Sequence, residues 1–106
     1  MSITGAQEVL TAATTTATSG WVHINSFAAV VQAWLANTTT PAATLIIEGS
    51  NEDVPTHPVA LATVELSGAL NANGYSTAAG YYWLRVRISA ITGTSAAVTA
   101  NIRGFE

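Results

Sequence analysis

The chain has 106 residues, enough for one domain that buries about 60 to 70% of the surface that its unfolded form exposes. It contains no cysteine, which excludes a disulfide framework, a thiolate metal site and a cysteine nucleophile. Charged residues make up 8% of the sequence, against about 25% in an ordinary globular domain, and lysine is absent. The net charge is -3 and there is no basic stripe for phosphates, so we expect no nucleic-acid partner.

The opening residues, MSITGAQEVL, lack the basic segment and the apolar core of a secretory signal. No apolar run approaches the roughly 20 residues that a membrane-spanning helix needs. We therefore expect a soluble protein made in the cytoplasm, with no membrane partner. A surface with so few charges is poorly protected against association. This favours a subunit whose faces are partly covered in an assembly, and a monomer with a polar, uncharged surface is the alternative.

The first predicted strand covers residues 7–17, because LTAATTTATSG is rich in threonine and holds neither proline nor charge. The next segment, WVHIN at residues 21–25, alternates in the manner of a half-buried strand. Val22 and Ile24 share one face, and the other face holds Trp21, His23 and Asn25.

Residues 26–37, SFAAVVQAWLAN, fit two structures. A helix could begin at Ser26 and end at Asn37. A strand would place alternate residues on one face, namely Phe27, Ala29, Val31, Ala33 and Leu35. We favour the strand, because the neighbouring segments are strands and an isolated helix would need its own packing partner.

Two further strands, 44–50 and 58–66, flank a short polar segment. In PVALATVEL the residues Val59, Leu61 and Thr63 alternate with Ala60, Ala62, Val64 and Leu66. The following stretch, SGALNANGYSTAAG at 67–80, is rich in turn residues, with Asn73-Gly74 as its strongest signal. We expect a turn there.

The clearest strand is YYWLRVRISAIT at residues 81–92. One face holds Tyr82, Leu84, Val86, Ile88 and Ala90, and the other holds Tyr81, Trp83, Arg85, Arg87 and Ser89. A turn at Gly93 leads into AAVTANIR, whose inward row is Ala96, Val98, Ala100 and Ile102. Seven or eight short strands predict an all-β fold: a single-domain antiparallel β-sandwich, jelly-roll-like, spanning 1–106, with residues 1–10 as an extended N-terminal arm.

The polar segment around residue 52 raises the question of a metal or catalytic site. Glu48, Glu52, Asp53 and His57 lie within ten residues, but their spacing matches no EF-hand loop or HExxH helix. A surface loop between two strands explains the same polarity, since loops must solvate their backbone. We expect a connecting loop, with no metal and no cofactor.

Catalysis is not favoured by any motif. Serine, histidine and aspartate are present, but there is no GxSxG elbow. Glu48 and Glu65 resemble a glycosidase carboxylate pair, yet a chain of this length offers little room for a substrate cleft. We expect no catalytic residues and predict that the protein is not an enzyme.

The stripe Tyr81, Trp83, Arg85 and Arg87 has three interpretations. The arginine stems can cover aromatic surface while their heads pair with Glu48 or Glu65 on neighbouring strands. Alternatively, the stripe is a subunit interface or a platform for a sugar. Trp21 and Trp34 each have two similar interpretations, as core residues or as interface residues.

Three segments together carry a family resemblance: FAAVVQAWLANTTTPAATLIIEGSNED, VALATVEL and GYYWLRVRISAITGTSAAVTANIRG. Residues 20–104 resemble a β-sandwich pattern found in small structural proteins of tailed bacteriophages, including head decoration proteins and tail or fibre modules, and in some carbohydrate-binding domains. Glu52-Asp53 stands where the pattern more often has aspartate and glycine, and Pro55 to Pro58 replace a tryptophan. These departures argue against a sugar-binding role for the loop.

The resemblance implies a capsid decoration or cement protein on the virion surface. Its partners would be the major capsid protein and copies of itself, as a dimer or trimer. The contact regions would be the N-terminal arm with Ile3, together with Trp21, Tyr81, Trp83, Arg85 and Arg87. The alternative is a receptor- or carbohydrate-binding module of a tail or fibre, in which Trp83 and Tyr81 stack on a glycan.

Overall fold

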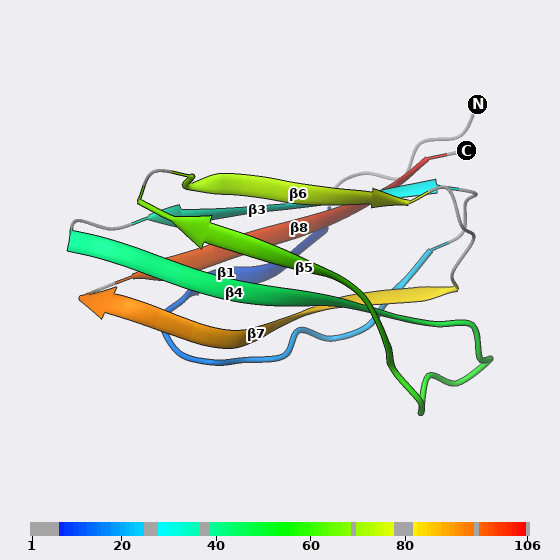
Figure 1. Cartoon of the computed structure of the whole chain (residues 1–106). Coiled ribbons are helices and arrows are strands. Elements are labelled where there is room, and N and C mark those ends of the chain that lie inside the picture. The colour runs from blue at the N-terminus through cyan, green and yellow to red at the C-terminus, as the bar shows by residue number, and fades with distance from the viewer. Residues whose placement is uncertain are drawn as a thin grey trace.

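The computed structural model describes residues 7–24, 28–36, 39–68, 70–77, 82–94 and 96–105 (Figure 1). The strands are β1 (Gln7–Ala13), β2 (Val22–His23), β3 (Ala28–Ala36), β4 (Thr39–Ser50), β5 (Val59–Ser67), β6 (Ala72–Thr77), β7 (Trp83–Thr94) and β8 (Ala97–Phe105). Among the described residues, no helix is long and apolar enough to cross a membrane.

The eight strands form two four-stranded antiparallel sheets, ordered β1-β8-β3-β6 and β2-β7-β4-β5. Successive strands alternate between the two sheets except at β4 and β5, which are paired neighbours in one sheet. Strand β1 therefore lies beside β8, β2 beside β7 and β3 beside β6. This is the jelly-roll arrangement, with the sheets stacked as two layers (Figure 1), and it confirms the predicted fold.

The core lies between the two sheets and is built from the alternation read in the sequence. Residues 28–36 are strand, not helix, and their inward side chains are Ala29, Val31, Ala33 and Leu35, each at most 5% exposed. Phe27 lies outside the described residues. From the facing sheet, Leu45, Ile47, Leu84, Val86 and Ile88 are almost wholly buried. Burial of these side chains is the main driving force for the sandwich.

Strand β6 corrects the prediction of a turn at Asn73-Gly74. Both residues lie inside a strand that pairs with β3, with Gln32 opposite Gly74. A Cβ atom at Gly74 would lie 2.5 Å from the carbonyl oxygen of Val31. The glycine is therefore required for close approach of two strands and not for a reversal of the chain.

Two register shifts explain where the alternation fails. Thr44 pairs with Ala90 but Leu45 pairs with Ile88, so Ser89 is an extra residue in β7. Ala90, predicted on the row of Ile88, is exposed as a result, and the next residue packs against the core. Likewise, β5 has an extra residue opposite the step from Ile47 to Glu48, so Ala60, predicted on the same row as Val64 and Leu66, is exposed while those two are buried.

The first strand is shorter than the predicted 7–17. It ends at Ala13, after a left-handed Ala12 with φ of 47° and two register shifts against β8. The chain then crosses to the other sheet, where Ser19 donates its backbone N–H to the carbonyl of Val86. The threonine-rich segment is thus a crossover between the two layers.

Candidate interaction face

One outer face of the sandwich gathers most of the residues that the sequence singles out. We call it the Trp–Arg face, and it consists of Trp21, His23, Glu48, Trp83, Arg85 and Arg87, from β2 and its preceding residue, β4 and β7. Leu84 and Val86 point into the core. The alternating residues of β7 must therefore point outward, as predicted.

Glu48 lies at the centre of this face and is 7% exposed. Its Oε1 lies 2.6 Å from Nε of Arg85, its cross-strand partner, and its Oε2 lies 3.3 Å from Nε of Arg87. Of the two carboxylates considered as partners of the arginine heads, Glu48 is the one that pairs with them. Glu65 instead accepts a hydrogen bond from the hydroxyl of Thr44 at 3.2 Å. Two guanidinium groups share one carboxylate, so the cluster keeps a positive charge on a chain whose net charge is -3.

The aromatic rings of the face are held by neighbouring side chains. The guanidinium of Arg85 lies 4.4 Å above the ring centroid of Trp21, in cation–π geometry. His23 contacts the rings of Tyr82 and Trp83, with centroids 4.6 and 4.8 Å away. Tyr82 is 44% exposed at the margin of the cluster. These contacts fix the side chains before any partner binds.

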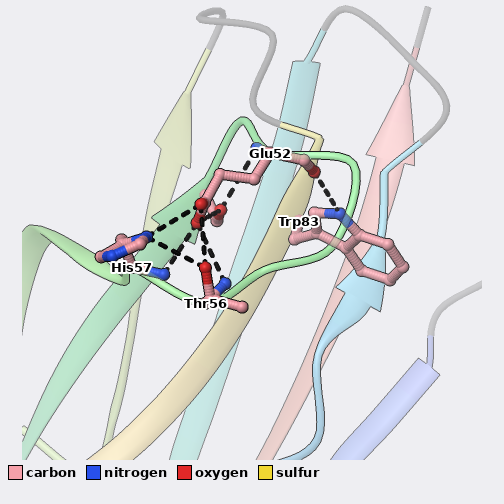
Figure 2. A network of polar contacts seen from close by, with 5 residues as sticks. Glu52, Thr56, His57 and Trp83 are labelled. Atoms are coloured by element: carbon pink, nitrogen blue, oxygen red, sulfur yellow. Dashed lines mark hydrogen bonds and ion pairs between the residues drawn. The ribbon is translucent and has the colours of Figure 1, made fainter.

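The loop between β4 and β5 is organised by the carboxylate of Glu52 (Figure 2). Its Oε1 accepts the backbone N–H groups of Thr56 and His57 at 3.0 and 2.7 Å, and the hydroxyl of Ser50 at 3.0 Å. Its Oε2 accepts the Thr56 hydroxyl and lies 2.9 Å from Nδ1 of His57. The His57 ring, followed by these backbone donors, holds the pKa of the Glu52 carboxyl well below its ordinary range.

The same loop is fastened to the Trp–Arg face. The indole Nε1 of Trp83 donates a hydrogen bond to the backbone carbonyl of Glu52 at 2.9 Å, as Figure 2 shows. The loop is a connection between strands, as predicted, but it also forms one border of the face. The sequence offered only an indirect signal for this role, namely hydroxyl residues flanking a carboxylate in a short, proline-containing segment.

The other predicted site residues lie elsewhere. Tyr81 and Ile3 fall outside the described residues. Trp34 lies on the outer side of β3, in the opposite sheet, where it pairs with Ala72 and Thr99. In the described part of the chain, no three acidic or histidine side chains are grouped as metal ligands. What the face offers is a preorganised set of aromatic and guanidinium groups, the residue types enriched where proteins bind proteins.

Comparison of the chain with protein-family models, with curated proteins and with solved structures found no match.

Proposed function

We propose that this protein is a virion structural protein: a capsid decoration or cement protein that binds the outer surface of a phage head and stabilises the shell. The jelly-roll topology supports this, since viral capsid domains use it, as do lectins. So does the resemblance of residues 20–104 to small structural proteins of tailed phages. Because one fold serves many functions, a function follows from a particular site and not from the fold alone.

The Trp–Arg face is the observation that carries the proposal. Two of the three tryptophans and two of the three arginines of the chain lie together on it. Their side chains are half-buried: Glu48 fixes the two arginines, Arg85 covers Trp21, and the Glu52 carbonyl holds Trp83. Little rotamer entropy therefore remains to be lost on binding. Tryptophan and arginine are enriched among the binding hot spots of protein interfaces.

Stabilisation of the shell would follow from linkage. A ligand that binds the assembled lattice, and not its separated subunits, shifts the equilibrium toward the lattice in proportion to its concentration and affinity. A low-charge surface suits this task, because neighbouring copies can approach one another without strong repulsion.

The alternative, a glycan-binding module of a tail or fibre, is less well supported by the ring geometry. A sugar stacks on an open aromatic face. Arg85 already covers Trp21, and His23 lies against Trp83. The ring of Tyr82, which is 44% exposed, lies at the margin of the cluster, so it is the side chain to test for sugar binding.

The test uses empty shells of the phage that encodes the chain, assembled without it, and mixed with purified protein. We expect saturable binding to shells and none to dissociated capsid subunits, measured by co-sedimentation. Saturation at a copy number matching the capsid surface lattice supports decoration. Absence of shell binding, together with binding to host glycans that is lost in Tyr82→Ala, would replace it by the tail-module function.

Two arginine variants make the test specific to the face. Arg87→Ala removes a partly exposed guanidinium from the Trp–Arg face, and we expect shell binding to weaken about tenfold or more. Arg103→Ala removes an exposed arginine from β8 in the other sheet and is the matched control. Equal losses in both variants would indicate a general charge effect and would contradict the assignment of this face.

A further inference from the structure

Four strands form the edges of the two sheets, and three of them are guarded against pairing with another chain. Strand β1 carries Glu8, two register shifts and the left-handed Ala12. Strand β2 has only two residues. Strand β5 carries Glu65 and a bulge, and follows Pro58. Charge, short length, irregularity and proline are the usual devices that block edge-to-edge association.

Strand β6, Ala72–Thr77, has none of these devices. Its sequence, ANGYST, contains no charge and no proline. Six consecutive residues pair with β3 without a register shift. Within the described part of the chain, β3 is its one sheet neighbour, so no strand pairs with its other edge (Figure 1). β6 is linked to β5 by a hydrogen bond from the Asn73 side-chain amide to the carbonyl of Glu65 at 3.1 Å.

The direction of the backbone groups on this edge follows from one hydrogen bond. Leu35 donates its N–H to the carbonyl of Asn71 at 2.8 Å. Hydrogen-bonded and non-bonded pairs alternate along an antiparallel ladder, so the N–H and C=O groups of Ala72, Gly74 and Ser76 point away from β3. Consistent with this, the Gly74 N–H donates a hydrogen bond to the side-chain oxygen of Asn73 at 2.8 Å, and this acceptor lies outside the ladder.

We propose that β6 pairs antiparallel with β6 of a second copy of this chain about a two-fold axis. Gly74 would lie opposite its own copy, and Ala72 opposite Ser76 of the second copy. The two four-stranded sheets would then join into one continuous sheet of eight strands. The Gly74 N–H would exchange the Asn73 side chain for a backbone carbonyl.

A second copy is the occupant that fits this strand best. A two-fold pairing sets a strand against itself, so any charge on it would face a like charge nearby. β6 carries no charge, whereas self-pairing of β5 would bring two Glu65 carboxylates together. The outward side chains of β6, from Ala72, Gly74 and Ser76, are also small enough to leave the joined sheet smooth. The pairing is independent of the proposed virion role, because it requires only this chain.

The experiment measures the mass of the purified protein by light scattering across a concentration series. We expect a dimer that dissociates to monomers on dilution. Ser76→Pro removes an outward N–H while leaving the ladder to β3 intact, a position where edge strands tolerate proline. We expect its dimer affinity to fall at least tenfold. Ser76→Ala keeps the N–H group and should dimerise as the wild type does.

Amide hydrogen exchange of the wild type gives a readout that does not depend on the proline variant folding. The amides of Ala72 and Ser76 should exchange more slowly at high protein concentration than at low concentration. A wild type that stays monomeric, a trimer, or a dimer whose Ala72 and Ser76 amides remain unprotected would overturn the proposal. Shell binding is measured separately on particles, so either proposal can fail without the other.

Discussion

The two sheets of the sandwich bury similar aliphatic side chains on their inner sides but differ on their outer sides. The outer side of β2-β7-β4-β5 holds two guanidinium groups around one nearly buried carboxylate, together with Trp21 and Trp83. The outer side of β1-β8-β3-β6 has mainly uncharged residues, among them Gln32, Trp34 and Asn101, and a β6 of small residues. One face is fixed by charge and aromatic contacts, and the other is flat and ends in an open edge.

This difference indicates how a charge-poor chain can present two distinct surfaces. The inner pattern alone suffices for the fold, so the few charged residues are free to be concentrated where directional contacts matter. Stability of the Trp–Arg face should depend on ion pairs and hydrogen bonds, and that of the opposite sheet on backbone fit. Substitutions in each sheet separate these two causes of stability.

The largest effect should come from Glu48→Ala. It removes a nearly buried carboxylate and leaves the guanidinium groups of Arg85 and Arg87 without their shared partner, and we expect a loss of about 3 kcal/mol in unfolding free energy. Glu65→Ala, an exposed carboxylate in the same sheet, should change stability by less than about 0.5 kcal/mol. Urea unfolding of both variants measures the contrast, and equal losses would refute the central role of Glu48.

A smaller loss of unfolding free energy, about 2 kcal/mol, should follow from Gly74→Ala in the opposite sheet, and its cause is steric. The added methyl group would meet the Val31 carbonyl oxygen at 2.5 Å, so β6 must shift away from β3. Gly20→Ala is the control, because a Cβ atom there has nothing within 4 Å. If both alanine variants were as stable as the wild type, the tight approach of β6 to β3 would be wrong.

Trp83→Phe should cost about 1 kcal/mol, because it keeps an aromatic ring but removes the hydrogen bond to the Glu52 carbonyl. Trp34→Phe makes the same change on the opposite sheet, where the indole makes no hydrogen bond within the described structure. We expect a smaller loss for Trp34→Phe in thermal unfolding. The reverse order would show that the loop is not fastened through Trp83.

The smallest effect is expected from the pH dependence of Glu52. Its pKa is lowered from an ordinary value of 4.5, so the stability that its carboxylate contributes is fully present above that pH and declines as the pH falls below it. Glu52→Gln should flatten this decline, measured as the urea midpoint from pH 7 to pH 3. Asp53→Asn removes a carboxylate of the same loop that has no hydrogen bond to the described residues, and it is the control for the loss of one negative charge.

The fold was predictable from the sequence wherever a strand of alternating inward and outward side chains pairs with its neighbours without a register shift. Residues 28–36 follow their pattern because both neighbours, β6 and β8, pair with them without a shift. The pattern failed at Ala60 and Ala90, because a bulge separates each of them from the rest of its predicted row and places it on the other face. A bulge depends on the partner strand, and period-two reasoning on one strand does not contain that information.

The candidate site was predictable in its residue types and less so in its contacts. The outward row of β7 and its pairing with Glu48 follow from alternation and opposite charge. The bond between Trp83 and the Glu52 carbonyl joins residues 31 apart in sequence, and no local pattern predicts it. The prediction of a turn at Asn73-Gly74 was wrong for a related reason. These residues are common in turns, but here they pair with β3, and that pairing depends on residues distant in the sequence.

The most direct test of the account is a cryo-EM map of empty shells saturated with the purified protein. We predict density for the domain repeated over the capsid surface, with the outer side of β2, β7 and β4 against the shell. The β6 edge should be turned toward a neighbouring copy. Decorated shells whose density places the opposite sheet against the capsid, or shells with no added density at saturating protein, would contradict the assignment of the Trp–Arg face as the shell-binding surface.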